Sequence, residues 1–287
     1  MNIRTIGVAG IGQMGCGIAH VFALAGFQVL LQDLSQDSLA KGQVSIDHSL
    51  QRGVEKGKLT QEEKAATLAR IRTTVSLGDF KEADFVVEAG PEHWETKKQI
   101  FETLDVLCPP GIILATSTGT LSVTRLASLT KRPGQVIGMH FMHPVPVMPL
   151  VEVVRGLATT DETCERVSFL SERLDKTPVQ CNDSPGFISN RLILPMINEA
   201  IFALQEGVAE VQAIDEIMKL GMNHPMGPLA LADLLGLDVC LANLQMLHHE
   251  FGDPKYRPCP LLGRYVAAGW LGKRSGRGFY DYASGTQ

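Results

Sequence analysis

Short apolar runs alternate with segments of helical spacing along the first part of the chain. The apolar run at 3–10 ends in glycine, and the segment 13–27 then places apolar side chains three or four residues apart. A second apolar run follows at 28–33. This order predicts a strand, a glycine turn, a helix and a second strand.

The same alternation continues to residue 175, starting with a polar segment of helical spacing over about 36–71. Further strands are predicted at 83–90, 111–118, 135–141 and 149–156, and helices at 93–107, 122–129 and 161–175. Buried strands that alternate with helices are typical of a largely parallel sheet that is covered on both faces.

The pattern changes near residue 184, where long apolar helical segments begin. These segments occupy 188–207, 211–221, 225–252 and 261–270. We therefore expect an α/β domain over 1–184 and an all-α domain over 185–287. The helices contain more apolar surface than one small domain needs, which favours a homodimer formed through them.

Composition excludes several classes of protein. The 287 residues are 45% hydrophobic and 20% charged with a net charge of −5, which is typical of a globular protein. A nucleic-acid-binding protein would carry a basic stripe, and only a short basic cluster occurs, at 272–282. Two uncharged runs are long enough to be checked as membrane spans. Glycines interrupt the run 5–32, and prolines break any helix in the run 133–151, so we expect no membrane span.

The cysteines are few and widely spaced. No CxxC pair occurs among the six, so a zinc or thioredoxin-like site is not expected. The His-His-Glu run at 248–250 has no metal-ligand spacing either, and we expect no metal site. Low cysteine density is typical of reduced proteins, which predicts a cytoplasmic location.

Residues 10–15 read GIGQMG, which is the GxGxxG pattern between a strand and a helix. Gly10 would allow the tight turn, Gly12 would let the backbone approach a pyrophosphate, and Gly15 would let helix and strand pack closely. Asp33, at the end of the second strand, would accept hydrogen bonds from ribose hydroxyls and repel a 2′-phosphate. A Rossmann-like domain that binds NAD is therefore predicted, the alternative being an ordinary glycine turn.

Two histidines and one glutamate stand in the apolar stretch MHFMHPVPVMPLVEVV, at His140, His143 and Glu152. Titratable groups are costly in apolar surroundings unless they are paired. An imidazole near neutral pKa suits reversible proton transfer in alcohol oxidation. From the residues alone, His140 is either such a base or a core histidine with satisfied hydrogen bonds.

The chain resembles the short-chain L-3-hydroxyacyl-CoA dehydrogenase family over nearly its whole length. The resemblance rests on GIGQMGCGIA, HFMHPVPVMPLVEVVRG, SPGFISNRLILPMINEA, KLGMNHPMGPLALADLLGLDVC and GDPKYRPCPLLGRYVAAGWLGKRSGRGFYDY. It implies NAD-dependent interconversion of 3-hydroxyacyl-CoA and 3-oxoacyl-CoA. It also implies an active site in a cleft between the domains, at the carboxyl ends of the strands.

The resemblance implies roles for individual residues. His140 matches the catalytic base, Glu152 its carboxylate partner, and Asn190 a residue that helps to hold the substrate oxygen. Ser49 and Lys56 match contacts to the CoA portion. The residues implied for cofactor binding are Gly10, Gly12, Gln13, Met14, Gly15, Asp33, Ala89, Glu92, Lys97 and Ser117. Glu92, Lys97 and Lys56 could instead be solvated charges on helix faces.

Several positions depart from the family pattern. Where the family has SNTSS, residues 116–120 read TSTGT, so that Ser117 replaces an asparagine near the nicotinamide and Gly119 replaces a serine that bonds the substrate oxygen. His143 and His93 also replace family asparagines. Gly119 and His143 are therefore candidate substrate contacts, and the changes reflect either drift or a changed substrate.

Three other functions are considered. One is a dehydrogenase of the same family for a different β-hydroxy acid or thioester, including a carrier-protein-bound one. The others are a non-catalytic NAD-binding protein and a structural protein derived from an enzyme. The presence of His140, Glu152 and Asn190 together argues against the last two.

Overall fold

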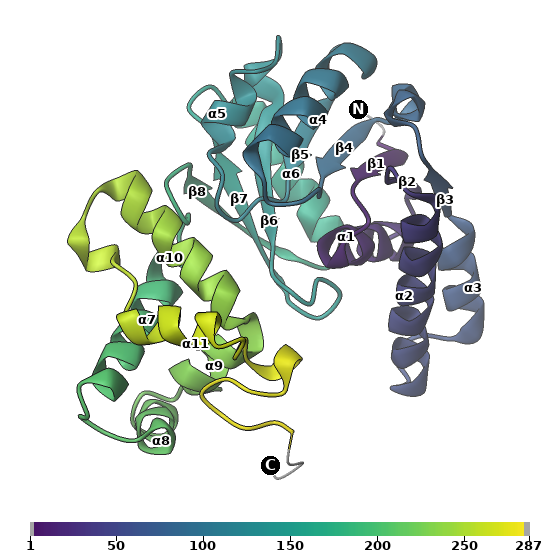
Figure 1. The fold of residues 1–287 in the computed structure, drawn as a ribbon. Helices are drawn as coiled ribbons and strands as arrows, with labels where there is room; N and C mark the ends of the chain where they lie inside the picture. The colour runs from purple at the N-terminus through teal and green to yellow at the C-terminus, as the bar shows by residue number, and fades with distance from the viewer. Residues whose placement is uncertain (1–2, 284–287) are drawn as a thin grey trace. The chain divides into compact units, whose positions relative to one another are not determined.

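The computed structural model describes residues 3–283, and the chain divides into two compact units (Figure 1). The first ends at Ser184 and the second begins at Pro185. The first is an α/β unit and the second is all-helical, which confirms the predicted fold class.

An eight-stranded sheet forms the centre of the first unit. Its strands are β1 (Thr5–Ala9), β2 (Gln28–Gln32), β3 (Ile71–Thr74), β4 (Phe85–Glu88), β5 (Ile113–Thr116), β6 (Val136–Phe141), β7 (Leu150–Arg155) and β8 (Thr177–Asn182). They lie in the order β3-β2-β1-β4-β5-β6-β7-β8. Strands β1 to β6 are parallel, β7 is antiparallel to β6, and β8 is parallel to β7.

The chain moves from β1 to β2 and β3 on one side, and then to β4, β5 and β6 on the other. The direction of winding therefore reverses between β1 and β4. In open α/β sheets, ligands bind outside the carboxyl ends of the strands at such a switch point. A ligand site is therefore expected at the segments that follow β1, β4, β5 and β6.

Six α-helices belong to this unit: α1 (Gln13–Leu24), α2 (Gln36–Glu55), α3 (Gln61–Ala69), α4 (Trp94–Leu107), α5 (Val123–Ala127) and α6 (Asp161–Arg173). Every residue of β4 and of β5 is buried, as expected of central strands with both faces covered. Phe22 of α1 packs against Phe85 of β4, with ring centroids 6.5 Å apart. This contact packs α1 against the sheet.

The structure refines the predicted elements at three places. The helical segment predicted over 36–71 is two helices, because Gly57 adopts a φ of +67° and Thr60 begins α3 with a capping box to Glu63. Strands β3 and β8 were not predicted. Both lie at edges of the sheet and are partly exposed, so their sequences lack the apolar pattern of buried strands.

The second unit contains α7 (Ser189–Gln205), α8 (Val211–Gly221), α9 (Pro228–Leu235), α10 (Leu237–Phe251) and α11 (Pro260–Ala267). Its core includes Ile197, Leu229 and Leu244, which have no exposed surface. The segment after α11 is held by two buried carboxylates. Asp233 accepts hydrogen bonds from the backbone of Phe279 and Tyr280, and Asp215 accepts one from the Tyr280 hydroxyl.

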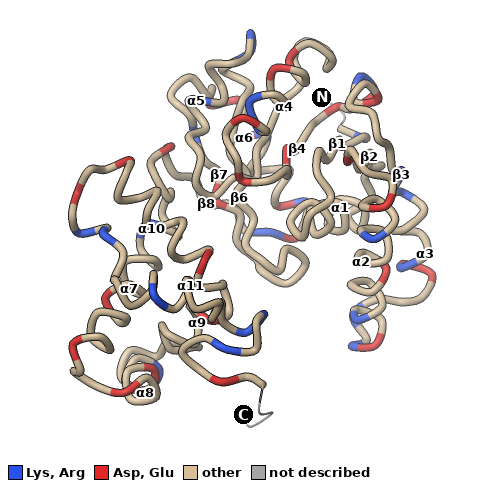
Figure 2. The backbone as a smooth tube through the Cα atoms, in the orientation of Figure 1, with Lys and Arg blue, Asp and Glu red and all other residues tan. Residues whose placement is uncertain are grey.

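Charges are distributed over both units, with Lys and Arg interspersed among Asp and Glu (Figure 2). Within residues 3–283, no single helix is both long and apolar enough to cross a membrane. Helices α9 and α10, which are bent by 98° relative to each other, meet the length and composition criteria only as a pair.

Candidate active site

The turn between β1 and α1 has the geometry that its three glycines predict. Gly10 has a φ of +112°, and a Cβ there would lie 2.5 Å from the carbonyl oxygen of Ala89, which follows β4. A Cβ at Gly15 would lie 1.9 Å from the Gly10 oxygen. Neither position accepts a side chain, because the turn, the helix and β4 approach one another too closely.

Gly12 differs, since a Cβ there would have no heavy atom within 4 Å. At Gly10 and Gly15 the missing side chain permits a close approach within the protein, whereas at Gly12 it leaves open space beside the backbone. No side chain caps the start of α1, and its first turn, which contains Gln13 and Met14, has no acidic residue. Such a helix N-terminus attracts anions, so these residues fit the pyrophosphate of a dinucleotide.

Asp33 directly follows β2, beside this turn. Its carboxylate accepts hydrogen bonds from the backbone N–H of Ile11 and of Ser35, both at 3.2 Å. The carboxylate is therefore oriented by the glycine turn itself. This arrangement fits the position of an acidic residue that binds the adenosine ribose.

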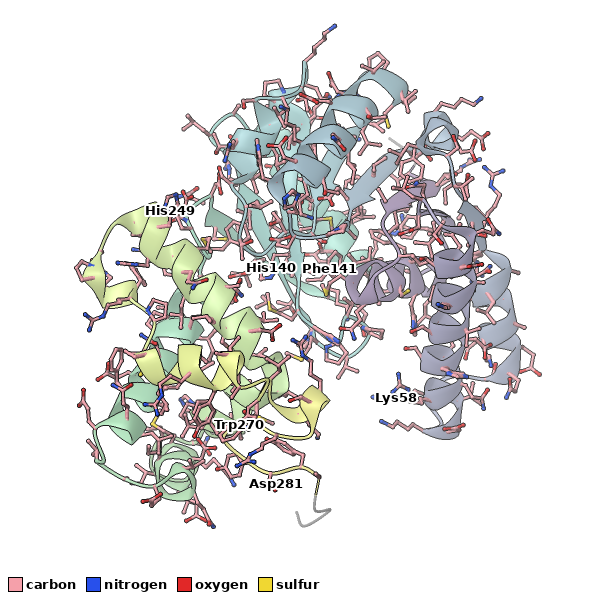
Figure 3. All side chains as sticks on the ribbon, viewed as in Figure 1. Lys58, His140, Phe141, His249, Trp270 and Asp281 are labelled. Atoms are coloured by element: carbon pink, nitrogen blue, oxygen red, sulfur yellow. The ribbon has the colours of Figure 1, made fainter. Side chains whose placement is uncertain are left out.

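His140 and Glu152 lie directly opposite each other on β6 and β7 (His140 and Phe141 are labelled in Figure 3). Residues paired across antiparallel strands point to the same face, which brings side chains twelve positions apart into contact. His140 Nδ1 is 2.6 Å from Glu152 Oε2, and the Glu152 carboxylate is buried. An imidazole held in this way has one tautomer favoured.

Glu92 holds the loop that follows β5. Its Oε1 atom accepts hydrogen bonds from the Thr118 hydroxyl, from the backbone of Gly119 at 3.2 Å, and from the backbone and hydroxyl of Thr120 at 3.1 and 2.6 Å. Burial raises the pKa of Glu92, but the charge of Lys97 and the hydrogen bonds of Thr118 and Thr120 outweigh it. The pKa therefore lies below its ordinary value.

Lys97 is completely buried, so a solvated helix-face charge is the wrong description of it. Its Nζ lies 2.8 and 2.9 Å from the two carboxylate oxygens of Glu88, which is also completely buried. Burial raises the pKa of Glu88, although Lys97 and the hydrogen bonds of Thr116 and Gly90 oppose the shift. This ion pair lies under the loops that follow β4 and β5.

The other predicted residues occupy separate places. Ser117 is buried at the end of β5, and its N–H donates to the Glu88 carbonyl oxygen at 2.8 Å. His143 is exposed in the connection between β6 and β7. Ser49 is half-buried on α2, and Lys56 is exposed at its C-terminus, two turns further along the same side. Asn190 is half-buried at the start of α7, in the second unit.

Sequence reasoning missed Glu88, Thr116 and Thr118. One signal was present, because Glu88 and Thr116 each end an apolar strand, and the carboxyl ends of neighbouring parallel strands lie at one edge. The same edge includes the ends of β1 and β6, because β1, β4, β5 and β6 are parallel neighbours. The first unit thus combines an anion-binding turn with a carboxylate-supported imidazole, which suits hydride and proton transfer.

Comparison with known proteins is consistent with this geometry. The model of the 3-hydroxyacyl-CoA dehydrogenase NAD-binding domain matches residues 5–184. The model of the C-terminal domain of the same enzymes matches residues 186–282. The match of the first domain confirms the prediction that the cofactor is NAD.

Whole-chain relatives agree with the domain models. The chain is 55% identical over 286 residues to the probable 3-hydroxybutyryl-CoA dehydrogenase of Bacillus subtilis, with all of both chains covered. It is 52% identical to the 3-hydroxybutyryl-CoA dehydrogenase of Bradyrhizobium diazoefficiens, over 98% of this chain and 96% of the relative. The crystal structure of (S)-3-hydroxybutyryl-CoA dehydrogenase from Ralstonia eutropha superposes with a TM-score of 0.94 at 48% identity, covering 98% of this chain and 99% of that one. The chain therefore belongs to the 3-hydroxyacyl-CoA dehydrogenase family and is an NAD-dependent oxidoreductase.

Proposed function

We propose that this chain interconverts L-3-hydroxyacyl-CoA and 3-oxoacyl-CoA, with the four-carbon pair 3-hydroxybutyryl-CoA and acetoacetyl-CoA as its first substrates to test. The names of the relatives support the substrate class. The observation that carries the proposal is the 2.6 Å contact between His140 and Glu152. It lies on the same sheet edge as the glycine turn.

His140 acts as the general base in the oxidation. Its Nδ1–H donates to Glu152, so that Nε2 takes the proton from the C3 hydroxyl as the C3–O bond gains double-bond character. Bound NAD supplies the acceptor for the hydride that leaves C3. In the reverse direction, the imidazolium returns the proton to the ketone oxygen, and Glu152 stabilises that imidazolium by its charge.

The remaining predicted residues bind and orient. Gly12, Gln13 and Met14 present the uncapped backbone of α1 to the pyrophosphate, and Asp33 accepts from the ribose hydroxyls. Because Asp33 repels a 2′-phosphate, NAD is preferred over NADP. Asn190 assists His140 at the substrate oxygen, and Ser49 and Lys56 contact the CoA portion.

The departures Ser117, Gly119 and His143 keep a second substrate class in consideration. If these residues contact the substrate, a β-hydroxy acid or a thioester with polar bulk near C3 would suit them better than the four-carbon pair. A panel of CoA esters, carrier-bound acyl groups and hydroxy acids, followed by NADH absorbance, separates the two. Turnover of acetoacetyl-CoA well below that of another member of the panel would contradict the four-carbon assignment.

His140→Ala tests the proposed base. Removal of a positioned general base lowers kcat by about 10²–10⁴-fold. NADH affinity should stay within about twofold, because His140 acts on the substrate. His249→Ala is the matched control, since His249 is exposed at the end of α10 (Figure 3). Activity of His140→Ala within a few-fold of that of the control would remove this residue from the mechanism.

We also propose that the chain forms a homodimer through its second unit. Large apolar side chains are exposed there, among them Leu220, Val208 and Leu192, which are 83%, 72% and 67% exposed. Exposed apolar surface of this kind favours association. Light scattering that gives the mass of one chain across a concentration series would contradict the proposal.

A further inference from the structure

Loop 142–149 joins β6 to β7 and starts two residues after His140. Three of its residues are prolines, which have no backbone N–H to donate. Within the loop, the N–H groups of Val147 and Met148 donate to the Pro144 carbonyl oxygen at 2.9 and 3.0 Å. Buried carbonyl oxygens elsewhere in the loop must therefore accept from donors outside it.

Lys176 supplies such donors from a position just before β8. Its Nζ donates to the carbonyl oxygens of Val145 at 2.7 Å and of Met148 at 2.9 Å. Lys176 is only 8% exposed, and within residues 3–283 no carboxylate forms an ion pair with it. Burial lowers the pKa of this ammonium, and the charge of Asp175 opposes the shift. Two backbone carbonyls of one loop are thus the groups that hold this buried cation.

The sheet brings Lys176 and the loop together. Strand β8 is parallel to β7, with Thr177 aligned with Leu150, so the residue before β8 lies beside the end of the loop. The N–H of Thr177 also donates to the Pro149 carbonyl oxygen at 2.7 Å. The pairing of β7 with β8 therefore fixes the backbone on both sides of the contact.

The same loop packs against α1, the helix whose start fits a pyrophosphate. Val145 is buried, and a Cβ at Gly17 of α1 would lie 2.8 Å from the Val145 Cβ. The loop is thus continuous with the strand of His140 and in close contact with α1. In the proposed function, the pyrophosphate lies at the start of α1 and hydride transfer takes place beside His140. The loop therefore connects two parts of the chain whose separation has to match the cofactor.

We propose that Lys176 is a positioning residue, which holds loop 142–149 against α1 and thereby sets the separation between the pyrophosphate-binding turn and His140. Lys176 itself contacts neither cofactor nor substrate. The proposal rests on the proposed function, and none of the roles implied by the family resemblance falls on this lysine. Because a misplacement of about 1 Å can lower a reaction rate about 100-fold, hydride transfer should respond more strongly than cofactor binding.

Lys176→Met tests the contact, because methionine is also unbranched and lacks all three N–H donors of the ammonium. Lys131→Met is the matched control, since Lys131 is exposed in the segment before β6. The first readout needs no cofactor and is hydrogen exchange of the backbone amides of loop 142–149, followed by mass spectrometry. The second is the single-turnover rate of acetoacetyl-CoA reduction, followed by NADH absorbance. The Kd of NADH is measured separately by fluorescence titration.

We expect the amides of Val147 and Met148 to exchange at least about tenfold faster in Lys176→Met than in the control, with the central strands unchanged. The single-turnover rate should fall by about tenfold or more, while the Kd of NADH stays within about twofold. A lysine with a merely structural role would lower the thermal unfolding temperature and leave the rate, measured well below that temperature, equal to that of the control.

Three results of this experiment would overturn the proposal. The first is unchanged exchange in the loop, and the second is a single-turnover rate within about threefold of that of the control. The third is a Kd of NADH that rises as much as the rate falls, because Lys176 would then act on cofactor binding.

Gly17→Ala keeps the proposal testable if Lys176→Met does not fold. This variant retains Lys176, but its new Cβ would meet Val145 at 2.8 Å, so the loop has to move away from α1. We expect the single-turnover rate to fall by about threefold or more, with the Kd of NADH within about twofold. An unchanged rate would overturn the proposal, because the position of the loop would then not control hydride transfer.

Failure of the proposed reaction would look different. A wild-type protein that binds NADH but leaves acetoacetyl-CoA unreacted contradicts the substrate assignment, and the rates are then compared with the member of the substrate panel that reacts. The exchange experiment uses the protein without cofactor or substrate. It therefore decides in either case whether Lys176 holds the loop.

Discussion

Glu152→Gln removes one negative charge from the catalytic pair and keeps the shape of the side chain. Glu152 is only 4% exposed, and its Oε2 is 2.6 Å from His140 Nδ1. Hydrogen bonds to charged groups contribute about 1.5–3 kcal/mol, and neutral ones about 0.5–1.5 kcal/mol. The lost difference of about 1–1.5 kcal/mol corresponds to roughly a tenfold decrease in kcat.

A second effect makes the decrease larger. A glutamine can present its amide N–H to Nδ1, which would favour the tautomer with the proton on Nε2. That tautomer cannot accept the substrate proton, and a comparable exchange in a catalytic triad lowers kcat by about 10⁴-fold. We therefore expect a decrease between about tenfold and 10⁴-fold, with NADH affinity unchanged.

A matched control distinguishes this effect from a general loss of structure. The assay is NADH absorbance in both directions, with Glu162→Gln on α6 as the exposed control. An activity of Glu152→Gln within threefold of that of the control would refute the pairing of His140 and Glu152 as a catalytic unit.

Three further variants test other parts of the site and the fold. Asp33→Ala should weaken NAD binding and reduce the preference for NAD over NADP, because the hydrogen-bond acceptor for the ribose and its negative charge are both lost. A wild type that prefers NADP in initial-rate assays would contradict this role of Asp33. Gly119→Ser should raise acetoacetyl-CoA turnover by about ten- to 150-fold, if the serine restores a hydrogen bond of about 1.5–3 kcal/mol to the substrate oxygen; unchanged turnover would indicate drift. Burial, assisted by the charge of Lys176, lowers the pKa of His20 from 6.5 to about 4, so its contribution to stability is complete above about pH 6.5 and is lost as the pH falls toward 4. As the pH falls, the free energy of unfolding of the wild type should therefore decrease by up to about 3 kcal/mol more than that of His20→Leu. Urea unfolding over a pH series measures both, and equal decreases in the two proteins would contradict this.

The glycine turn shows how far local sequence alone can predict the site. The GIGQMG run, the apolar strands beside it and Asp33 all lie within the first 33 residues. The conformation of the turn and of the strands depends on residues only a few positions away. The strand, the turn and the helix were predicted from the period of the hydrophobic residues and from the positions of the glycines. The family resemblance, which rests on long segments, added the roles of His140, Glu152 and Asn190.

Edge strands and charged interior residues were beyond this reasoning. Strand β8 was missed because none of its residues is buried and its sequence therefore has little hydrophobic pattern. Lys97 looked in the sequence like any lysine of an amphipathic helix. Its burial depends on Glu88, nine residues earlier, and on Thr116, which follows in the next strand.

The sequence by itself determined the alternation of buried strands with helices, the dinucleotide-binding turn and the family, because period, turn chemistry and motif spacing are properties of neighbouring residues. Only the tertiary structure decided the edge strands β3 and β8 and the contacts that the buried residues Glu88 and Lys97 make. The parallel alignment of β4 with β5 brings Glu88 beside Thr116, and the antiparallel alignment of β6 with β7 brings His140 beside Glu152. The physical reason is that ion pairing and burial depend on distances across the sheet, which strand register sets and residue spacing along the chain does not.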